Sequence, residues 1–213
     1  KDRKQHLITR ALIRTVLSKY ITHVAPKDWE FILNDYGRPH VLPSLLPFPL
    51  YFNLSHTTNM IALAVSNCQE VGIDVESLDR DNITDDLANY AFSPHEYQQL
   101  KSLGPAKFKD RFFDLWTLKE SYIKACGMGL SIPLDSFSFS FPKDDKISIQ
   151  FAQHRNDNPS KWKFWKLQLE QQYIVSLAAK SDVKDLKYQL LMKRTTPLEE
   201  TVVTSYPVTM ASE

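Results

Sequence analysis

The chain has 213 residues, 43% of them hydrophobic, which is enough to bury a core in one domain or in two small, tightly packed halves. Its net charge of +1 indicates neither a nucleic-acid partner nor a strongly acidic one. The longest apolar run, Met60 to Val65, is far shorter than the ~20 residues of a membrane-spanning helix, and Cys68 and Cys126 form neither a zinc motif nor a disulfide framework. We therefore expect a soluble, cytoplasmic protein with reduced cysteines and no membrane attachment.

The amino-terminal residues predict an amphipathic helix that ends at Pro26 at the latest. Apolar residues recur from Leu7 to Val16 at steps of three and four, and Arg10 and Arg14 fall on the polar side. A solvated helix face is the simplest interpretation of the basic residues in this segment.

Short extended segments follow in the first half. A strand is predicted at Trp29 to Leu33, and turn residues precede Pro39 to Pro49, a proline-rich stretch that we expect to be a loop without regular structure. Further extended pieces are predicted at 51–56 and 60–66, and the clearest strand of the chain at 71–76.

The second half predicts helices and then strands. Short helices are expected between 79 and 107, one starting at Ser93 with Glu96 three residues on, and a long helix from Phe112 to Cys126. Four strands are expected in an antiparallel sheet, at 137–141, 147–151, 161–169 and 173–179. Beyond Thr195 the weak pattern predicts a loose tail or one edge strand. The division is therefore 1–78, 79–195 and a tail 196–213.

Two carboxylates share one face of the predicted strand 71–76. The strand period of two places Gly72, Asp74 and Glu76 on one side and the valine and isoleucine residues on the other. Their side chains could converge on one hard cation of magnesium size. Taken alone, an acid-x-acid pair on a strand is usually a solvated face, so the pair is weak evidence for a metal site.

The long helix carries a second group of polar residues among apolar ones. Glu120 and Lys124 are one turn apart and share a face, and Lys119 lies next to them in sequence. A surface ion pair is the alternative interpretation of this spacing.

Phosphate contacts are suggested by two further segments. Ser55 and His56 end a short extended segment with a hydroxyl and an imidazole, and Arg38 lies between a glycine and a proline. His56 as a core histidine and Arg38 in a plain turn are the alternatives. The sequence contains neither a Walker loop nor Gly-x-Gly-x-x-Gly.

Taken in order, five motifs resemble the Sfp-type 4′-phosphopantetheinyl transferases of the holo-acyl-carrier-protein synthase superfamily. They are Gly-Arg-Pro at 37–39, Phe-Asn-Leu-Ser-His-Thr at 52–57, Gly-Ile-Asp-Val-Glu at 72–76, Trp-Thr-Leu-Lys-Glu-Ser-Tyr-Ile-Lys-Ala at 116–125 and Gly-Met-Gly-Leu at 127–130. The resemblance runs from the amino end to about Phe141 and weakens beyond it. It implies an α+β fold of two similar halves, each a small antiparallel sheet with a packed helix, and an active site between them.

The resemblance also implies the reaction and the residues that perform it. The 4′-phosphopantetheine arm of coenzyme A passes to a serine of an acyl, peptidyl or aryl carrier protein, and 3′,5′-ADP is released. Asp74, Glu76 and Glu120 match magnesium ligands, Glu120 also matching the general base. Lys124 is the candidate to stabilise the leaving phosphate, and Lys119 is a weaker candidate for the same contact with coenzyme A. Ser55 and His56 match phosphate contacts, and Arg38 lies where the family often has a basic residue near the nucleotide end of coenzyme A.

The amino-terminal end is where we expect this chain to depart from the family that it resembles. Family members begin with an additional stretch holding a first strand and basic residues, and we expect this chain to lack it. An inactive relative that binds coenzyme A or a carrier protein without transfer is therefore an alternative, as is a structural domain with surface carboxylates. We expect a monomer, and the identity of the carrier protein is not encoded in these motifs.

Overall fold

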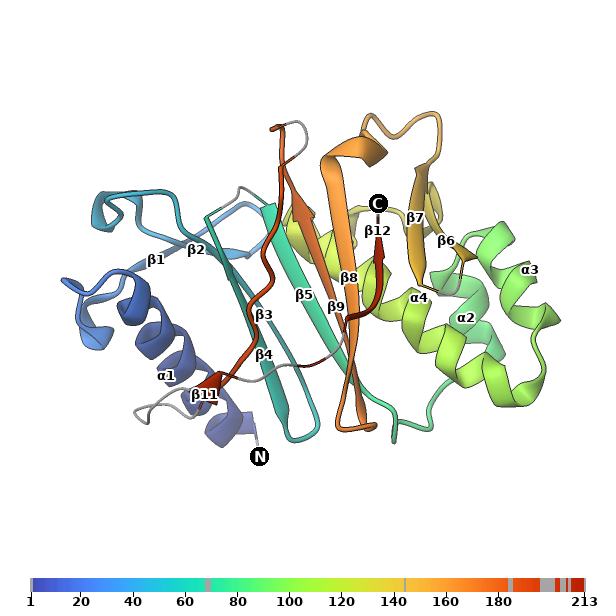
Figure 1. Ribbon diagram of the computed structural model, residues 1–213, viewed down its shortest axis with the longest axis horizontal. Helices are drawn as coiled ribbons and strands as arrows, with labels where there is room; N and C mark the ends of the chain where they lie inside the picture. Colours follow the sequence, from blue (N-terminus) through green and yellow to red (C-terminus); the bar gives the residue numbers. More distant parts are fainter. Residues whose placement is uncertain are drawn as a thin grey trace.

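The computed structural model describes residues 2–67, 70–143, 145–183, 186–195, 202–203, 206 and 208–212. Helix α1 lies at one end of the molecule, helices α2 and α3 lie at the other, and β-strands fill the space between them (Figure 1). The predicted α+β class is confirmed. Cys68 and residues 196–201 of the predicted tail lie outside the described residues. None of the helices in the described ranges is long and apolar enough to cross a membrane.

The amino-terminal half combines one helix with two hairpins. Its elements are α1 (Asp2–Tyr20), β1 (Phe31–Leu33), β2 (Pro39–Val41), β3 (Tyr51–Thr57) and β4 (Met60–Ser66). β1 pairs with β2, and β3 pairs with β4 over its full length. A small core holds α1 against both hairpins, and it contains Leu17, Ile21, Val24, Trp29, Val41, Leu50 and Phe52.

The prediction of an irregular loop from Pro39 to Pro49 is wrong in its first part. Pro39 begins strand β2, where it pairs with Leu33, and a short 3₁₀ helix occupies Pro43–Leu45. Proline is tolerated as the first residue of a strand in a two-stranded ribbon, because the missing N–H is not needed for an interior ladder.

The main sheet has six strands in the order β5-β9-β8-β12-β7-β6. Their bounds are β5 Glu70–Ser77, β6 Phe137–Lys143, β7 Lys146–Phe151, β8 Trp162–Leu169, β9 Tyr173–Lys180 and β12 Val208–Ser212. The predicted strands at 71–76, 137–141, 147–151, 161–169 and 173–179 are confirmed. A separate pair joins β10 (Lys193–Arg194) to β11 (Val202–Val203).

Strand β12 occupies an interior position of this sheet, so the prediction of a loose tail or an edge strand is wrong. It pairs antiparallel with β8 and parallel with β7, and the parallel pairing is an exception to the expected antiparallel sheet. The sheet also crosses the expected division at residue 78. β5 belongs to the first segment but pairs along its whole length with β9 of the second.

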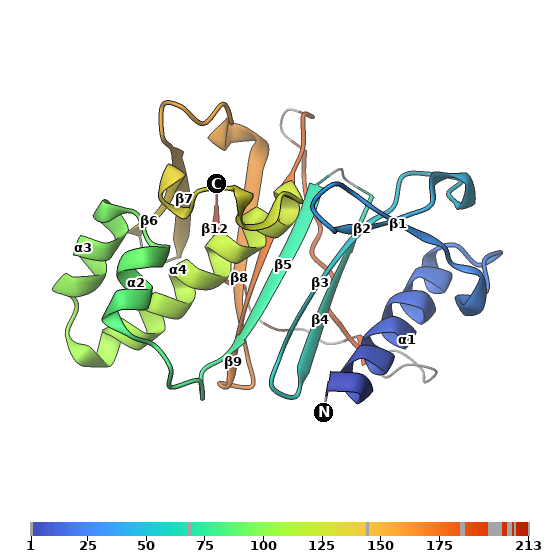
Figure 2. The same ribbon diagram turned by 180° about the vertical axis from the view of Figure 1, so that it is seen from behind.

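Helices cover one side of the main sheet, which faces the viewer in Figure 2. α4 (Pro105–Cys126) lies across the sheet, and α2 (Asp85–Ala91) and α3 (Pro94–Ser102) lie beside it at the end of the molecule. The predicted helix start at Ser93 is confirmed as a capping box with Glu96. α4 begins seven residues before the predicted Phe112, because Gly104 and Pro105 supply an N-cap and a first helical residue that the apolar pattern does not reveal.

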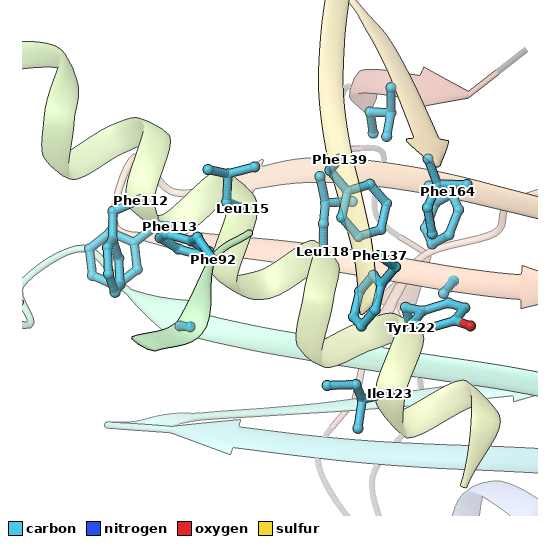
Figure 3. Packing of buried hydrophobic residues seen from close by; sticks show 14 of the residues in the cluster. Phe92, Phe112, Phe113, Leu115, Leu118, Tyr122, Ile123, Phe137, Phe139 and Phe164 are labelled. Carbon is cyan, nitrogen blue, oxygen red and sulfur yellow. The ribbon is translucent and has the colours of Figure 1, made fainter. Parts of the chain in front are cut away.

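The largest core lies between α4 and the main sheet. Aromatic side chains from α4 meet those of β6 and β8 there, as Figure 3 shows for Tyr122, Phe137, Phe139 and Phe164. The rings of Tyr122 and Phe137 have centroids 4.5 Å apart. This packing fixes α4 across the sheet and so determines which residues of the helix face β5.

Candidate functional site

Strand β5 has the two faces that its period of two predicts, and the face that carries Gly72 packs on α4. Val71, Ile73 and Val75 enter a core shared with β4 and β9. On the opposite face, a Cβ atom added to Gly72 would lie 2.0 Å from the backbone oxygen of Ser121 and 2.3 Å from the backbone nitrogen of Ala125. Glycine therefore permits backbone contact between β5 and α4, and this contact brings Asp74 near the last turns of the helix.

Side chains join β3 to the open edge of β5. The two strands belong to different sheets, although they lie side by side in both views (Figures 1 and 2). Asn53 Oδ1 accepts the N–H of Ile73 at 2.9 Å, and Ser55 Oγ accepts the N–H of Val75 at 3.3 Å. The residues on this face of β3 are thus held at fixed positions beside Asp74.

Asp74 is the centre of a polar cluster that three elements build. Its Oδ1 accepts hydrogen bonds from Lys124 Nζ of α4 at 2.6 Å and from Ser55 Oγ of β3 at 2.8 Å. Lys124 Nζ also lies 2.8 Å from Ser55 Oγ. Asp74 is 4% exposed, and its Oδ2 is buried without a hydrogen-bond partner. Such an oxygen is costly unless a further donor or cation binds it.

Glu76 lies one strand period beyond Asp74 and pairs with a residue that the sequence did not reveal. Its Oε1 accepts a hydrogen bond from Arg80 Nη1 at 2.7 Å, and the Arg80 guanidinium lies over the ring of Trp116. Burial and the neighbouring Asp74 raise the pKa of Glu76, although Arg80 and a hydrogen bond from Trp116 oppose this. The carboxylate is therefore less stable as an anion than an exposed glutamate.

Glu120 of α4 is close enough to Asp74 and Glu76 for their negative charges to affect its pKa. Burial raises the pKa of Glu120 first, and Asp74 and then Glu76 add to this, while Lys124 acts in the opposite direction. These mutual effects place the three predicted carboxylates in one electrostatic environment. A cation bound among them would relieve a repulsion that the protein alone does not cancel.

The residues fit a magnesium ion in chemistry, although they are not assembled around one. Carboxylate oxygens are the ligands that magnesium prefers, and the unpartnered Asp74 Oδ2 offers one of them. In the described residues, however, no group of three or more His, Cys, Asp or Glu side chains is arranged to hold a metal ion. Lys124 and Arg80 neutralise Asp74 and Glu76 in this arrangement.

The two predicted phosphate contacts on β3 differ in their surroundings. Ser55 is 5% exposed and lies within the Asp74 cluster. His56, the next residue, is exposed. The structure therefore brings Ser55 to the predicted site and leaves His56 at the surface beside it.

Arg38 is brought to the carboxyl end of α4, where backbone oxygens surround its guanidinium. Nη1 donates to the carbonyls of Lys124 at 2.8 Å and Ala125 at 2.6 Å, and Nη2 donates to Val71 at 2.8 Å and Phe52 at 3.5 Å. Burial lowers the pKa of Arg38, and Nε is buried without a partner. These bonds occupy the groups that a phosphate would need.

Lys119 lies outside the cluster, in the core on another side of α4. Its Nζ lies 2.9 Å from a carboxylate oxygen of Glu96 and donates to the carbonyls of Leu134 and Phe137, both at 2.7 Å. The side chain is 2% exposed. These contacts hold the Lys119 ammonium in the core, away from the Asp74 cluster.

Sequence reasoning missed residues that support the site. Asn53 and Ser55 share a face of β3, so the strand period could have identified Asn53. Arg80 follows Glu76 by four residues, but the segment between them leaves the strand, and no periodicity relates the two side chains. Gly72 was assigned to the polar face without its role in admitting α4.

The cluster has the parts for chemistry on a phosphate ester. The half-buried Glu120 carboxylate, with its raised pKa, is suited to accept a proton, and a lysine ammonium can stabilise negative charge on a leaving group. Ser55 supplies a hydroxyl to the described cluster around Asp74. The Ser55 hydroxyl donates its hydrogen bond to the Asp74 carboxylate and not to a histidine base. A nucleophile from a second substrate is therefore consistent with the geometry.

Comparison with known proteins identifies a family. The model of the family described as "4'-phosphopantetheinyl transferase superfamily" matches residues 70–178, which include β5, α4, strands β6 to β8 and most of β9. Asp74, Glu76, Glu120 and Lys124 all lie within the matched residues, whereas Arg38 and Ser55 precede them.

Curated relatives match a larger part of the chain. A "4'-phosphopantetheinyl transferase" of Bacillus subtilis is 39% identical over 70% of this chain and 64% of its own length. "4'-phosphopantetheinyl transferase gsp" of Aneurinibacillus migulanus is 37% identical over 74% of this chain and 62% of its own. "4'-phosphopantetheinyl transferase Sfp" of Bacillus subtilis (strain 168) is 35% identical over 70% and 64%. The chain thus spans a little under two thirds of these relatives.

Proposed function

Because the chain belongs to the 4′-phosphopantetheinyl transferase superfamily, we propose that it transfers the 4′-phosphopantetheine arm of coenzyme A to a serine of an acyl, peptidyl or aryl carrier protein. The observation that carries this proposal is the cluster of Asp74, Lys124 and Ser55, in which β5, α4 and β3 each supply one residue. The raised pKa of Glu120 beside this cluster supports the same chemistry.

The reaction forms one bond and breaks another. The serine oxygen of the carrier protein attacks the β-phosphorus of coenzyme A, the pyrophosphate P–O bond breaks, and 3′,5′-ADP leaves with the bonding electrons. Glu120 is proposed to accept the serine proton, directly or through water. Since the attacking hydroxyl belongs to the carrier protein, the enzyme needs no nucleophile of its own.

Charge neutralisation is the main task of the remaining residues. Asp74, Glu76 and Glu120 would hold Mg²⁺, which would offset the negative charge of the pyrophosphate when bound. Lys124 is proposed to turn from Asp74 to the leaving phosphate, and Ser55 and His56 to donate hydrogen bonds to the phosphates. The partial exposure of the Lys124 side chain, 27%, supports access to a substrate.

The remaining assignments concern location and assembly. We propose that the protein acts in the cytoplasm as a monomer, with coenzyme A and an apo carrier protein as its partners. Sedimentation of the purified protein at several concentrations tests the monomer, and a dimer that does not dissociate on dilution would contradict it.

Mass spectrometry of apo carrier proteins tests the transfer. Carriers of the acyl, peptidyl and aryl classes are incubated with the protein, coenzyme A and Mg²⁺, and at least one is expected to gain the phosphopantetheine mass. Reactions with Asp74→Ala, and with a chelator in place of Mg²⁺, are expected to show no gain. If the parent protein modifies none of the carriers, the proposed transfer is wrong. Full activity with the chelator would contradict the metal assignment alone.

A further inference from the structure

Arg38 contacts the same three elements that build the Asp74 cluster. Its bonds go to the carbonyls of Lys124 and Ala125 on α4, of Val71 on β5 and of Phe52 on β3. Those elements contribute Lys124, Asp74 and Ser55 to the cluster. The Arg38 side chain therefore binds the backbone of α4, β3 and β5. On the two strands the bound carbonyls lie three residues before Ser55 and Asp74.

The bonds from Arg38 to α4 include one to the backbone of Lys124, the helical residue of the Asp74 cluster. The last carbonyls of a helix lack intrahelical partners and carry partial negative charge, so a cation at this end is favourable. One of the oxygens that Arg38 binds belongs to Lys124 itself, and the next belongs to Ala125. The backbone from which the Lys124 ammonium extends toward Asp74 is thus fixed.

The turn that carries Arg38 is tied to the same helix end. Asn34 Nδ2 donates to the carbonyl of Gly127 at 2.8 Å, and Asn34 Oδ1 accepts the N–H of Arg38 at 2.8 Å. Gly37 has a φ of 83°, a left-handed conformation that suits glycine and completes the turn. Asn34 and Arg38 therefore dock the β1–β2 hairpin on the carboxyl end of α4.

We propose that Arg38 is a positioning residue, which holds the carboxyl end of α4 against β3 and β5 and so places the Lys124 ammonium at Asp74 and Ser55, and that it does not contact the phosphates of coenzyme A. The inference rests on the proposed function for its kinetic consequence. Its structural basis is independent, because all four hydrogen bonds join parts of the chain itself.

The shape of the guanidinium makes this role specific to arginine. The two terminal nitrogens carry four hydrogens in one plane, and each nitrogen here contacts two carbonyls. A lysine ammonium has three donors at a single point and cannot reach all four oxygens. If Arg38 only supplied charge to a phosphate, lysine would replace it well. Arg38→Lys therefore separates the two roles.

The test is a double-mutant cycle between Arg38→Lys and Lys124→Met, with two readouts. Isothermal titration calorimetry measures the Kd for coenzyme A with Mg²⁺ and without carrier protein, and single-variant kinetics measure kcat. Arg38→Lys alone is expected to lower kcat about tenfold or more, because a small misplacement of a charged group is sufficient for such a loss. On the Lys124→Met background, Arg38→Lys is expected to leave the Kd unchanged within about twofold.

Opposite results would overturn the proposal. An Arg38→Lys enzyme with the kcat of the parent excludes a positioning role. A loss of affinity for coenzyme A by the same factor with and without Lys124 indicates direct phosphate binding by Arg38. Because the affinity cycle needs no turnover, it still decides the matter if the parent protein transfers nothing, an outcome that would contradict the proposed function instead.

Two further variants separate positioning from loss of stability. Lys166→Met removes a buried ion pair between β8 and Asp114 of α4, distant from Lys124 in the helix, and is expected to lower Tm without lowering kcat below the melting range. Asn34→Ala removes the bonds that hold the Arg38 turn on the carboxyl end of α4, so it loosens the guanidinium and is expected to lower kcat measurably, though less than Arg38→Lys does. If Arg38→Lys fails to fold, an Asn34→Ala enzyme with unchanged kcat would be sufficient to reject the proposal.

Discussion

Lys124 and Lys119 lie five positions apart on one helix and have entirely different neighbours. Both lie on α4, yet Lys124 reaches a cluster at the junction of three elements while Lys119 is enclosed by Glu96 and two carbonyls. Burial lowers the pKa of Lys119, and Glu96 opposes this. The different neighbours, rather than the side chains themselves, decide which ammonium is available to a substrate.

Glu120→Gln is expected to abolish turnover and to raise stability near neutral pH. Since the pKa of Glu120 is raised, the folded chain binds this proton more tightly than the unfolded chain, and stability falls as the pH rises through the raised pKa. Glutamine removes that cost. Its Tm should exceed that of the parent at about pH 7.5, and the difference should shrink toward about pH 3, where the carboxyl is protonated in both states.

Thermal melts across this pH range, compared with the exposed control Asp86→Asn, measure the effect. A Tm difference that does not vary with pH would show that the charge of Glu120 is not what costs stability. Retained transferase activity would remove Glu120 from the role of general base.

Lys119→Met is expected to lower the free energy of unfolding by about 3–5 kcal/mol, because it leaves the buried Glu96 without its cation. Urea denaturation measures this loss, and calorimetry with coenzyme A measures any change in affinity. A normal stability together with weakened binding of coenzyme A would restore the phosphate contact predicted from the sequence.

At the scale of the element, the contact between β5 and α4 determines the site. The structure explains it through Gly72, whose missing side chain admits the backbone of Ser121 and Ala125. Any side chain here must push α4 away from the strand, and with it Glu120 and Lys124. The distance between two elements is thus encoded in one residue.

Gly72→Ala is therefore expected to destabilise the protein by about 1–3 kcal/mol or more, as overpacking does elsewhere. Activity should fall further than stability accounts for, because both helical residues of the site are displaced. Gly104→Ala is the matched control, since a Cβ atom there meets nothing within 4 Å. Equal activity of the two variants at a temperature where both are folded would contradict this account.

Elements were predictable from the sequence where a local pattern defines them. The polar face of β5 follows from its period of two, and the start of α3 follows from Ser93 and Glu96. Arg80 and the enclosure of Lys119 depend on contacts between segments distant in sequence, which no local period records. β12 was missed for the same reason. It is a strand because it pairs with β7 and β8 on its two sides, and both are distant from it in sequence.

At the scale of the whole molecule, the predicted halves are joined more closely than their division suggests. β5 lies between them, paired by backbone with β9 and held by side chains to β3. The main sheet also depends on β12, which lies 41 positions beyond its partner in β8 at the pair of Leu167 and Val208. The stability of the main sheet therefore depends on pairings between segments that are distant in sequence.

Met210→Asp is expected to destabilise the main sheet, because Met210 packs against the large core from β12. The control is Val208→Asp on the same strand, where the side chain is 43% exposed and little should change. Unfolding midpoints in urea and light scattering at 37 °C measure stability and association, since opened edges of β7 and β8 favour aggregation. Identical behaviour of the two variants would show that β12 does not contribute to the core.

The side-chain seam between β3 and β5 has a consequence for hydrogen exchange. The amides of Ile73 and Val75 are bound by Asn53 and Ser55, whereas the alternate amides of β5 face β9 and its backbone ladder. Because two rotatable side chains make these bonds, β3 and β5 can separate locally and briefly while the hydrogen bonds between β5 and β9 stay formed. Ile73 and Val75 should therefore exchange with deuterium faster than Asp74 between them, and a ligand bridging the seam should slow them selectively.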